Sequence, residues 1–179
     1  ITIAATFKDV SSSAWYYTYV EELVKDGVVK SADNYRPNDS LNRAELVKMV
    51  VTAKSGLTGY TAPATATFDD VKTGAWYYDY VEAAVQLGYV SGYKDSKGSL
   101  TGKFGPGDIV NRAAAMKILA TAFKVPTTLT PASTFSDVAT GAWYHDYVVT
   151  AYNQSIVDGY SNGKFGPADP VTRAQVAKL

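Results

Sequence analysis

The chain has 179 residues, and 46 % of them are hydrophobic, which is enough apolar material for a folded core. Seventeen basic residues balance seventeen acidic ones, so no broad positive field exists to attract nucleic acid or an anionic membrane. Cysteine is absent and His145 is the single histidine, which argues against disulfides and metal sites. No apolar run approaches the roughly 18 to 20 residues that span a bilayer. We therefore expect a folded chain with no membrane insertion, nucleic-acid partner, metal or cofactor.

A first repeated block joins Phe-x-Asp-Val to Ala-Trp and a tyrosine-rich stretch. Apolar residues then recur at helical spacing, so each block predicts a helix. Glycine favours a helix end after the first two of these helices, at Gly27 and Gly88. Ser155 replaces the glycine in the third, where we expect a less sharply defined end. The blocks begin at Phe7, Phe68 and Phe135.

A second repeated block consists of an aromatic-x-Pro segment, an arginine six residues after the proline, and a predicted helix that begins there. The arginines are Arg43, Arg112 and Arg173. Asn42 with Glu45 has the pattern of a capping box, in which two side chains satisfy amides at the helix start. Thr172 with Gln175 has the same pattern. Repeat two keeps half of it, because Ala114 stands where the acid would be.

The two blocks divide the chain into three helix-loop-helix repeats, at residues 1–60, 61–127 and 128–179. From tryptophan to arginine they span 28, 36 and 30 residues, so the length varies only between the blocks, as in a surface loop. Segments 55–66 and 125–133 are rich in Thr, Ala and Pro and are predicted linkers. Few residues follow Arg173, so we expect a truncated last helix and a downstream region. One repeat would be marginal alone, which predicts a single cooperative unit.

These blocks resemble the S-layer-homology repeat, and the resemblance covers nearly the whole chain. It rests on Phe-x-Asp-Val, Trp, Gly-Tyr, Phe-x-Pro and, in repeat three, Thr-Arg-Ala-Gln. It implies a mainly α fold whose three helix-loop-helix repeats form a pseudo-threefold spindle around a central helical bundle. It also implies a non-catalytic anchor of an extracellular cell-wall or surface-layer protein. The implied ligand is pyruvylated N-acetylmannosamine of a secondary cell-wall polysaccharide, held in grooves between repeats.

The resemblance implies that the arginine of the second block contacts the acidic sugar. A cation at a helix start is disfavoured by the helix dipole, so a repeated arginine there needs a compensating anion. A ketal-linked pyruvate offers carboxylate oxygens to the guanidinium and to free amides of the helix start. An internal ion pair is the alternative, and both interpretations stay open. The acids that could form it are Asp9, Asp70, Asp137 and Glu45.

Further candidate ligand-binding residues accompany the arginines. The tryptophans could face a sugar ring, although we favour a packed core position for them. The Gly-Tyr turn could let a ligand approach the backbone. Repeat one has Ser31-Ala32 instead, which puts its groove in doubt. The third helix residue is expected to orient its own repeat's arginine, which ranks Arg112, with Ala114, below the other two. These candidates are Trp15, Trp76, Trp143, Gly92, Tyr93, Gly159, Tyr160, Glu45 and Gln175.

No arrangement of nucleophile, acid and base recurs, so we expect no enzyme activity. His145 aligns with Tyr17 and Tyr78, which predicts a surface position rather than a catalytic base. Two other functions stay open. The chain could bind peptidoglycan, or it could be a self-assembling lattice unit whose tyrosine-rich faces contact neighbouring surface-layer chains.

Overall fold

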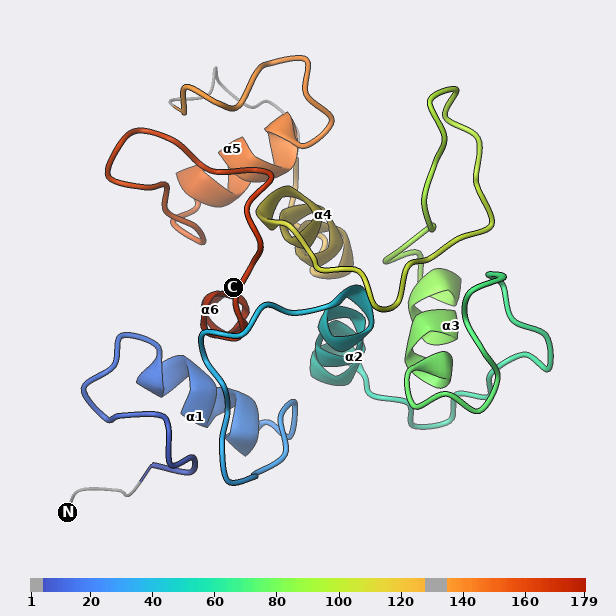
Figure 1. The fold of residues 1–179 in the computed structure, drawn as a ribbon, viewed down its shortest axis with the longest axis horizontal. Helices are drawn as coiled ribbons and strands as arrows, with labels where there is room; N and C mark the ends of the chain where they lie inside the picture. Colours follow the sequence, from blue (N-terminus) through green and yellow to red (C-terminus); the bar gives the residue numbers. More distant parts are fainter. Residues whose placement is uncertain (1–4, 128–134) are drawn as a thin grey trace.

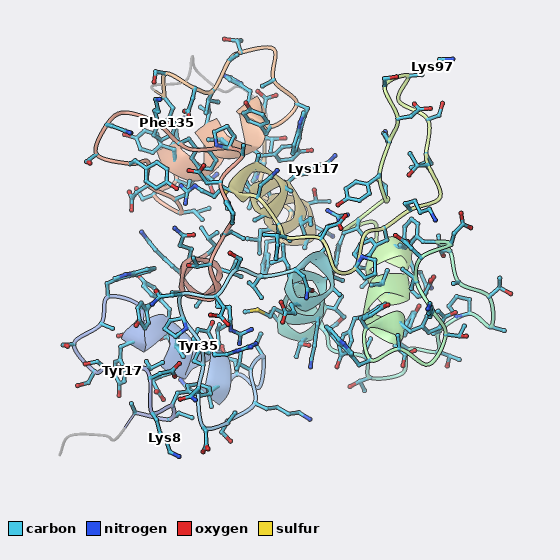
Figure 2. The ribbon with its side chains drawn as sticks, viewed as in Figure 1. Lys8, Tyr17, Tyr35, Lys97, Lys117 and Phe135 are labelled. Atoms are coloured by element: carbon cyan, nitrogen blue, oxygen red, sulfur yellow. The ribbon has the colours of Figure 1, made fainter. Side chains whose placement is uncertain are left out.

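A computed structural model describes residues 5–127 and 135–179 and is mainly helical. Each repeat contributes two helices, as predicted, and this described part holds isolated β-bridges but no strand. The predicted linker at 55–66 contains no helix, whereas that at 125–133 lies largely outside the described residues. The longer loop of repeat two projects outward with Lys97 near its tip (Figure 2). The helices are α1 (Tyr17–Lys25), α2 (Arg43–Lys54), α3 (Tyr78–Gln86), α4 (Arg112–Ala122), α5 (His145–Asn153) and α6 (Arg173–Lys178).

The second helix of each repeat packs on the first helix of another repeat. Helix α2 contacts α3, α4 contacts α5, and α6 returns to contact α1. Figure 1 shows α2, α4 and α6 in the middle of the molecule, with α1, α3 and α5 outside them. The apolar stripes of the second helices are buried there, for example at Val47, Val51 and Met116. The prediction that other repeats would cover these stripes is therefore confirmed.

A closed ring of backbone hydrogen bonds joins the three repeats just before their second helices. The Leu41 N–H donates to the Val171 carbonyl at 3.1 Å, and the Val171 N–H donates to the Val110 carbonyl at 2.9 Å. The Val110 N–H completes the ring by donating to the Leu41 carbonyl at 2.9 Å. All three residues are buried, so water cannot substitute for these partners. No repeat can form the ring alone.

The amides at the second-helix starts are also satisfied by another repeat. In α2, the Arg43 N–H donates to Asp108 and the Ala44 N–H donates to Pro106, at 2.9 and 3.1 Å. Helices α4 and α6 repeat both contacts with the next loop. The third N–H is bound by the side chain at the cap, and the two predicted capping boxes are present. The expectation of free amides for a ligand at these helix starts is therefore wrong.

The aspartate of each Phe-x-Asp-Val motif holds the aromatic-x-Pro loop of the same repeat. The Asp70 carboxylate accepts the N–H groups of Phe104 and Gly105, both at 2.9 Å. Asp9 and Asp137 bind their own loops in the same way. Burial alone would raise the pKa of Asp70, but hydrogen bonds from backbone amides, together with the charge of Lys103, outweigh it and hold the pKa below its usual value.

Two expectations for the third repeat are wrong. Ser155 adopts a left-handed conformation, with φ 57°, at the position of Gly27 and Gly88, and α5 has nine residues like α1 and α3. The helix end is thus the same, at a backbone cost of about 1 kcal/mol for the non-glycine residue. His145 is buried rather than at the surface, and its Nδ1 lies 2.8 Å from Asp146.

The hydrogen-bond ring and the shared core predict that the chain unfolds in one step. A single calorimetric transition, with equal calorimetric and van 't Hoff enthalpies, is expected. Residues 1–60 or 61–127 expressed alone should lack the helical circular-dichroism spectrum of the whole chain. A stably folded isolated repeat, or resolved successive transitions, would contradict this.

Replacing Asp70 with Asn should lower the free energy of unfolding by about 1.5 to 3 kcal/mol at pH 7, because two charge-assisted hydrogen bonds are weakened. A carboxylate with a lowered pKa stabilises the fold above its unfolded pKa of about 3.9, and this contribution is lost as the pH falls. The difference from wild type should therefore shrink below about pH 4.

Chemical denaturation at pH 7 and pH 3.5 measures both effects. The neighbouring, exposed Asp69 provides the control, since Asp69→Asn should change stability by less than about 0.5 kcal/mol. Equal losses for the two variants would show that the loop does not depend on Asp70.

Candidate functional site

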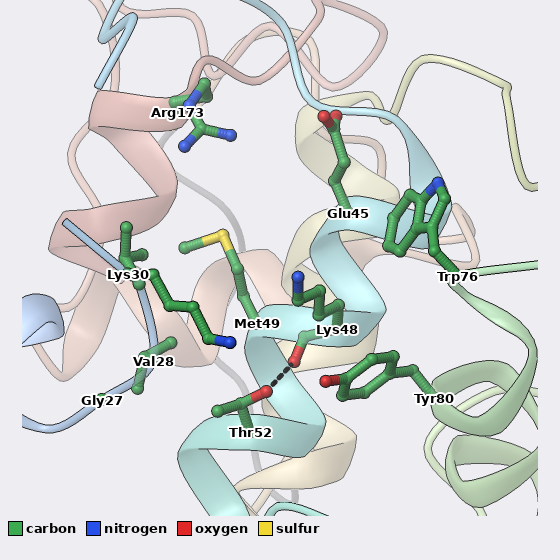
Figure 3. A pocket seen from close by; sticks show the side chains of 11 residues that line it. Gly27, Val28, Lys30, Glu45, Lys48, Met49, Thr52, Trp76, Tyr80 and Arg173 are labelled. Carbon is green, nitrogen blue, oxygen red and sulfur yellow. Dashed lines mark hydrogen bonds between the residues drawn. The ribbon is translucent and has the colours of Figure 1, made fainter. Parts of the chain in front are cut away.

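A pocket of about 400 Å³ lies where the three repeats meet, and we call it the Arg173 groove. Arg173 of α6 faces Glu45 and Lys48 of α2 across this space (Figure 3). Lys30 reaches it from the segment after α1, and Trp76 of repeat two lines its edge. The arginine, the helix and the tryptophan thus come from three different repeats.

A second pocket, of about 270 Å³, uses the corresponding positions one repeat on, and we call it the Arg112 groove. Its lining includes Arg112 together with Gln175 and Lys178 of α6. Asp158 stands at the position of Lys30, and Trp15 at that of Trp76. Each groove therefore combines the arginine of one repeat, the second helix of the next and the tryptophan of the third.

The lining of the two grooves contradicts the expectation that the third helix residue orients the arginine of its own repeat. The arginine and the third helix residue of one repeat line different grooves, so Arg173 meets Glu45 and Arg112 meets Gln175. By the same correspondence, Ala114 of α4 shares a groove with Arg43. The ranking that placed Arg112 last used Ala114 as its partner, and that reason is wrong.

Each arginine is held in place by an aromatic-x-Pro loop. Its Nε donates to the carbonyl of the aromatic residue at 2.7 to 2.8 Å, and its guanidinium lies 4.5 to 4.7 Å from the centre of that ring. A guanidinium fixed by its Nε and one face still presents its Nη edge, which matches a carboxylate. The pairs are Arg43 with Phe104, Arg112 with Phe165, and Arg173 with Tyr35.

No internal ion pair neutralises these arginines within the described part of the chain. No carboxylate oxygen there lies within 4.0 Å of their guanidinium nitrogens. The four acids considered for this role act elsewhere, because the motif aspartates bind backbone amides and Glu45 accepts the Asn42 N–H. A direct ion pair is therefore contradicted for all three arginines, although Asp70 acts on Arg43 from a longer distance.

A tyrosine covers the second face of two arginines. The Arg43 guanidinium lies between Tyr93 at 4.6 Å and Phe104, and Arg112 lies between Tyr160 at 5.1 Å and Phe165. Each tyrosine hydroxyl donates to an aspartate of the loop, at 2.8 and 2.9 Å. Burial lowers the pKa of Arg43, and Tyr93, Asp108 and Asp70 partly oppose this effect.

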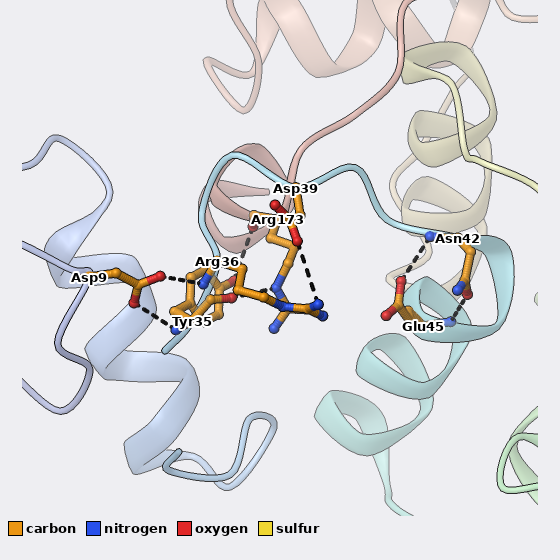
Figure 4. Close-up of polar contacts among 7 residues, drawn as sticks. All are labelled: Asp9, Tyr35, Arg36, Asp39, Asn42, Glu45 and Arg173. Carbon is orange, nitrogen blue, oxygen red and sulfur yellow. Dashed lines mark hydrogen bonds and ion pairs between the residues drawn. The ribbon is translucent and has the colours of Figure 1, made fainter. Parts of the chain in front are cut away.

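The loop of repeat one lacks this tyrosine. Arg173, the arginine held by that loop, therefore lies in a more open site. Arg173 is half-buried, whereas Arg43 and Arg112 are 9 % and 7 % exposed. Arg36 occupies the adjacent loop position and pairs with Asp39 at 3.5 Å (Figure 4). The Arg173 groove also has a larger volume than the Arg112 groove. A groove is thus present beside the loop that lacks the Gly-Tyr turn, and its arginine is the more exposed one; ligand binding there stays a prediction.

The three tryptophans are exposed, so the prediction of a core position is wrong. Trp15, Trp76 and Trp143 are 58 %, 54 % and 58 % exposed. Each packs edge-to-face on the tyrosine that follows it, with ring centres 5.2 to 5.3 Å apart. The indoles are thereby held in place while a face stays available to a sugar ring.

A lysine that the sequence interpretation missed completes the site. It is the fifth residue after each arginine, at Lys48, Lys117 and Lys178. The first two ammonium groups lie 5.5 and 5.6 Å from the ring centres of Trp76 and Trp143. The signal was available, since the same residue occurs at this position in every repeat. It was missed because an isolated lysine on a helix is normally a solvated surface residue.

The glycines of the Gly-Tyr turns have a packing role. A Cβ at Gly92 would lie 2.4 Å from the Phe68 ring, and one at Gly159 would lie 2.2 Å from the Phe135 ring. Gly159 and Tyr160 line the Arg112 groove, whereas Gly92 and Tyr93 belong to the Arg43 site. The turns therefore let the first block pack closely, and ligand contact by their backbone stays a prediction.

Neither a metal centre nor a membrane span is found in residues 5–127 and 135–179. No three acidic, histidine or cysteine side chains gather there closely enough to hold an ion. None of the helices described there is long and apolar enough to cross a bilayer.

Fold and site together define a three-repeat helical binding module with cationic, tryptophan-edged grooves between its repeats. The S-layer homology domain model matches residues 6–47, 67–116 and 134–177, and the chain belongs to this family. It is 29 % identical over 181 residues to an amylopullulanase of Thermoanaerobacterium thermosulfurigenes, covering 97 % of the chain and 9 % of that protein. It is also 29 % identical over 184 residues to the surface-layer 125 kDa protein of Lysinibacillus sphaericus, covering 99 % and 15 %. The chain thus spans less than a fifth of these relatives.

Tyr35 beneath Arg173 offers a test of the loop that carries this arginine. Its buried hydroxyl donates to the Arg173 carbonyl at 3.0 Å, and burial raises the pKa to about 12, although Arg173 opposes the shift. Tyr35→Phe should lower the free energy of unfolding at pH 7 by about 1 kcal/mol, because one hydrogen bond is lost.

The same variant should show a changed pH dependence. A tyrosine with a raised pKa stabilises the fold below its unfolded pKa of about 10, and the contribution is lost as the pH rises toward 12. The advantage of wild type in urea unfolding should therefore narrow above pH 10. An advantage that stays constant from pH 7 to 11 would contradict this origin.

Proposed function

We propose that the chain is a non-catalytic cell-wall anchoring module whose grooves bind carboxylate-bearing sugars of a secondary cell-wall polysaccharide. One observation carries this proposal: a fixed arginine without an acidic partner lies in a groove edged by an exposed tryptophan. A pyruvylated N-acetylmannosamine supplies both complements. Its carboxylate fits the guanidinium edge and the nearby lysine, and its apolar sugar face fits the indole.

The relatives support an anchoring role over catalysis. They include surface-layer proteins as well as an amylopullulanase and an endoglucanase, and the chain matches only a small part of each. A segment shared by lattice proteins and hydrolases is more simply a common attachment module than a common catalyst. We infer that the protein acts outside the cell, at the wall.

We also propose that the repeats form the pseudo-threefold spindle implied by the family. The closed hydrogen-bond ring supports it, because each repeat makes the same contact to the next and the third returns to the first. The equivalent composition of the Arg173 and Arg112 grooves is a second argument for it.

At the Arg173 groove, removal of the pyruvate ketal should weaken binding about 5- to 30-fold, since a charge-assisted pair outweighs one neutral contact by about 1 to 2 kcal/mol. Arg173→Ala should cost about 2 kcal/mol or more of binding free energy at the Arg173 groove. Isothermal titration calorimetry with the pyruvylated and plain sugars measures both. Lys97→Ala, which removes an exposed cation near the tip of the projecting loop of repeat two, is the control and should bind normally.

Equal affinities for the two sugars would refute a carboxylate site. Co-sedimentation with purified walls then tests the polymer itself. Binding should be lost when the non-peptidoglycan polysaccharide is extracted, whereas retained binding would favour peptidoglycan as the ligand.

A further inference from the structure

After each outer helix the chain has a pair of buried or half-buried residues, and the exposed residue that directly follows this pair differs in charge among the repeats. It is Lys30 in repeat one, Ser91 in repeat two and Asp158 in repeat three. Lys30 lines the Arg173 groove and Asp158 lines the Arg112 groove. One structural position therefore carries a cation, a neutral residue and an anion in a module whose proposed ligand is anionic.

Asp158 forms a hydrogen bond with each of the two cations of its own groove. Its carboxylate lies 2.7 Å from the Lys178 ammonium, and its backbone carbonyl accepts a hydrogen bond from Arg112 Nη2 at 3.1 Å. The equivalent lysines, Lys48 and Lys117, lie over tryptophan rings instead. Asp158 thus stands where a ligand carboxylate would otherwise meet Lys178, and it would repel that carboxylate.

The two grooves differ in charge as a result. The Arg173 groove is lined by three cations, Arg173, Lys30 and Lys48, and by one carboxylate, that of Glu45, which already accepts the Asn42 N–H. The Arg112 groove has two cations and Asp158. An exposed carboxylate beside an exposed tryptophan suits the hydroxyl groups and apolar face of an uncharged sugar.

We propose that residue 158 sets the ligand selectivity of the Arg112 groove, so that this groove takes an uncharged sugar while the Arg173 groove takes the acidic sugar. The inference rests on the proposed function and divides its ligand between two sites. The module would then bind a polymer that presents acidic and neutral sugars together, and each occupied groove would strengthen the attachment of the other.

Indole N–H signals in ¹H–¹⁵N spectra can report each site separately, because each site has its own tryptophan. Assignment follows from single Trp→Phe variants. The probes are the methyl glycosides of pyruvylated and of plain N-acetylmannosamine. In wild type, the Trp76 signal should respond to the acidic sugar at lower concentration than the Trp15 signal.

Asp158→Ser installs the residue of repeat two. The half-saturation concentration of the acidic sugar at Trp15 should fall about two- to fivefold, the range for one exposed charge pair. That of the plain sugar should not fall. The reverse change, Ser91→Asp, should weaken the Trp143 response to the acidic sugar by a similar factor. Asp33→Ser breaks another exposed Lys–Asp pair, with Lys8, and should change none of these values.

The outcomes separate this inference from the function on which it rests. A Trp76 signal that favours the acidic sugar, together with a Trp15 signal unchanged by Asp158→Ser, would overturn the inference alone. A Trp76 signal that does not distinguish the two sugars would overturn the proposed function and the inference with it. A gain at Trp15 for both sugars alike would also overturn the inference, because Asp158 would then only obstruct the groove.

Discussion

Three buried hydrogen bonds, between the backbones of Leu41, Val110 and Val171, fix the geometry on which the rest of this molecule depends. They set the start of each second helix against the other two repeats. The adjacent amides donate hydrogen bonds to a neighbouring loop and to the cap side chain. The helix starts therefore offer a ligand no backbone donors. Binding chemistry is left to side chains that emerge at the junctions between repeats.

The arginines at these junctions lower the stability of the fold. A cation at the first position of a helix opposes the helix dipole, and the burial of Arg43 and Arg112 against aromatic rings removes water from them. None of the described carboxylates forms a direct ion pair with Arg43, Arg112 or Arg173, although Asp108 and Asp70 act on Arg43 from a longer distance. Such an arrangement is typical of binding sites, where an unpaired charged group lowers the stability of the free protein and the ligand supplies its partner.

Local chemistry could be predicted from the sequence, and long-range pairing could not. The helix starts, the two capping boxes and the repeated arginines follow from short motifs, and the structure contains all of them. Glu45, in contrast, follows Arg43 by two residues yet lies in the groove of Arg173, because α2 presents the two side chains to different neighbours. The exposure of Trp76 was equally hidden, since an indole between aromatic residues at a helix start resembles a core anchor. Only the three-dimensional order of the repeats decides these points.

The distribution of each groove over three repeats shapes how such a module can change during evolution. A repeat supplies an arginine to one junction, a helix face to a second and a tryptophan to the third. A point substitution therefore alters one junction and leaves the others as they were, so the sites can diverge after the repeats are duplicated. Deletion of a whole repeat, in contrast, would remove a part from every junction and open the hydrogen-bond ring. Changes in single residues or in loop length are therefore tolerated at one junction at a time, whereas loss of a repeat would disrupt all three junctions.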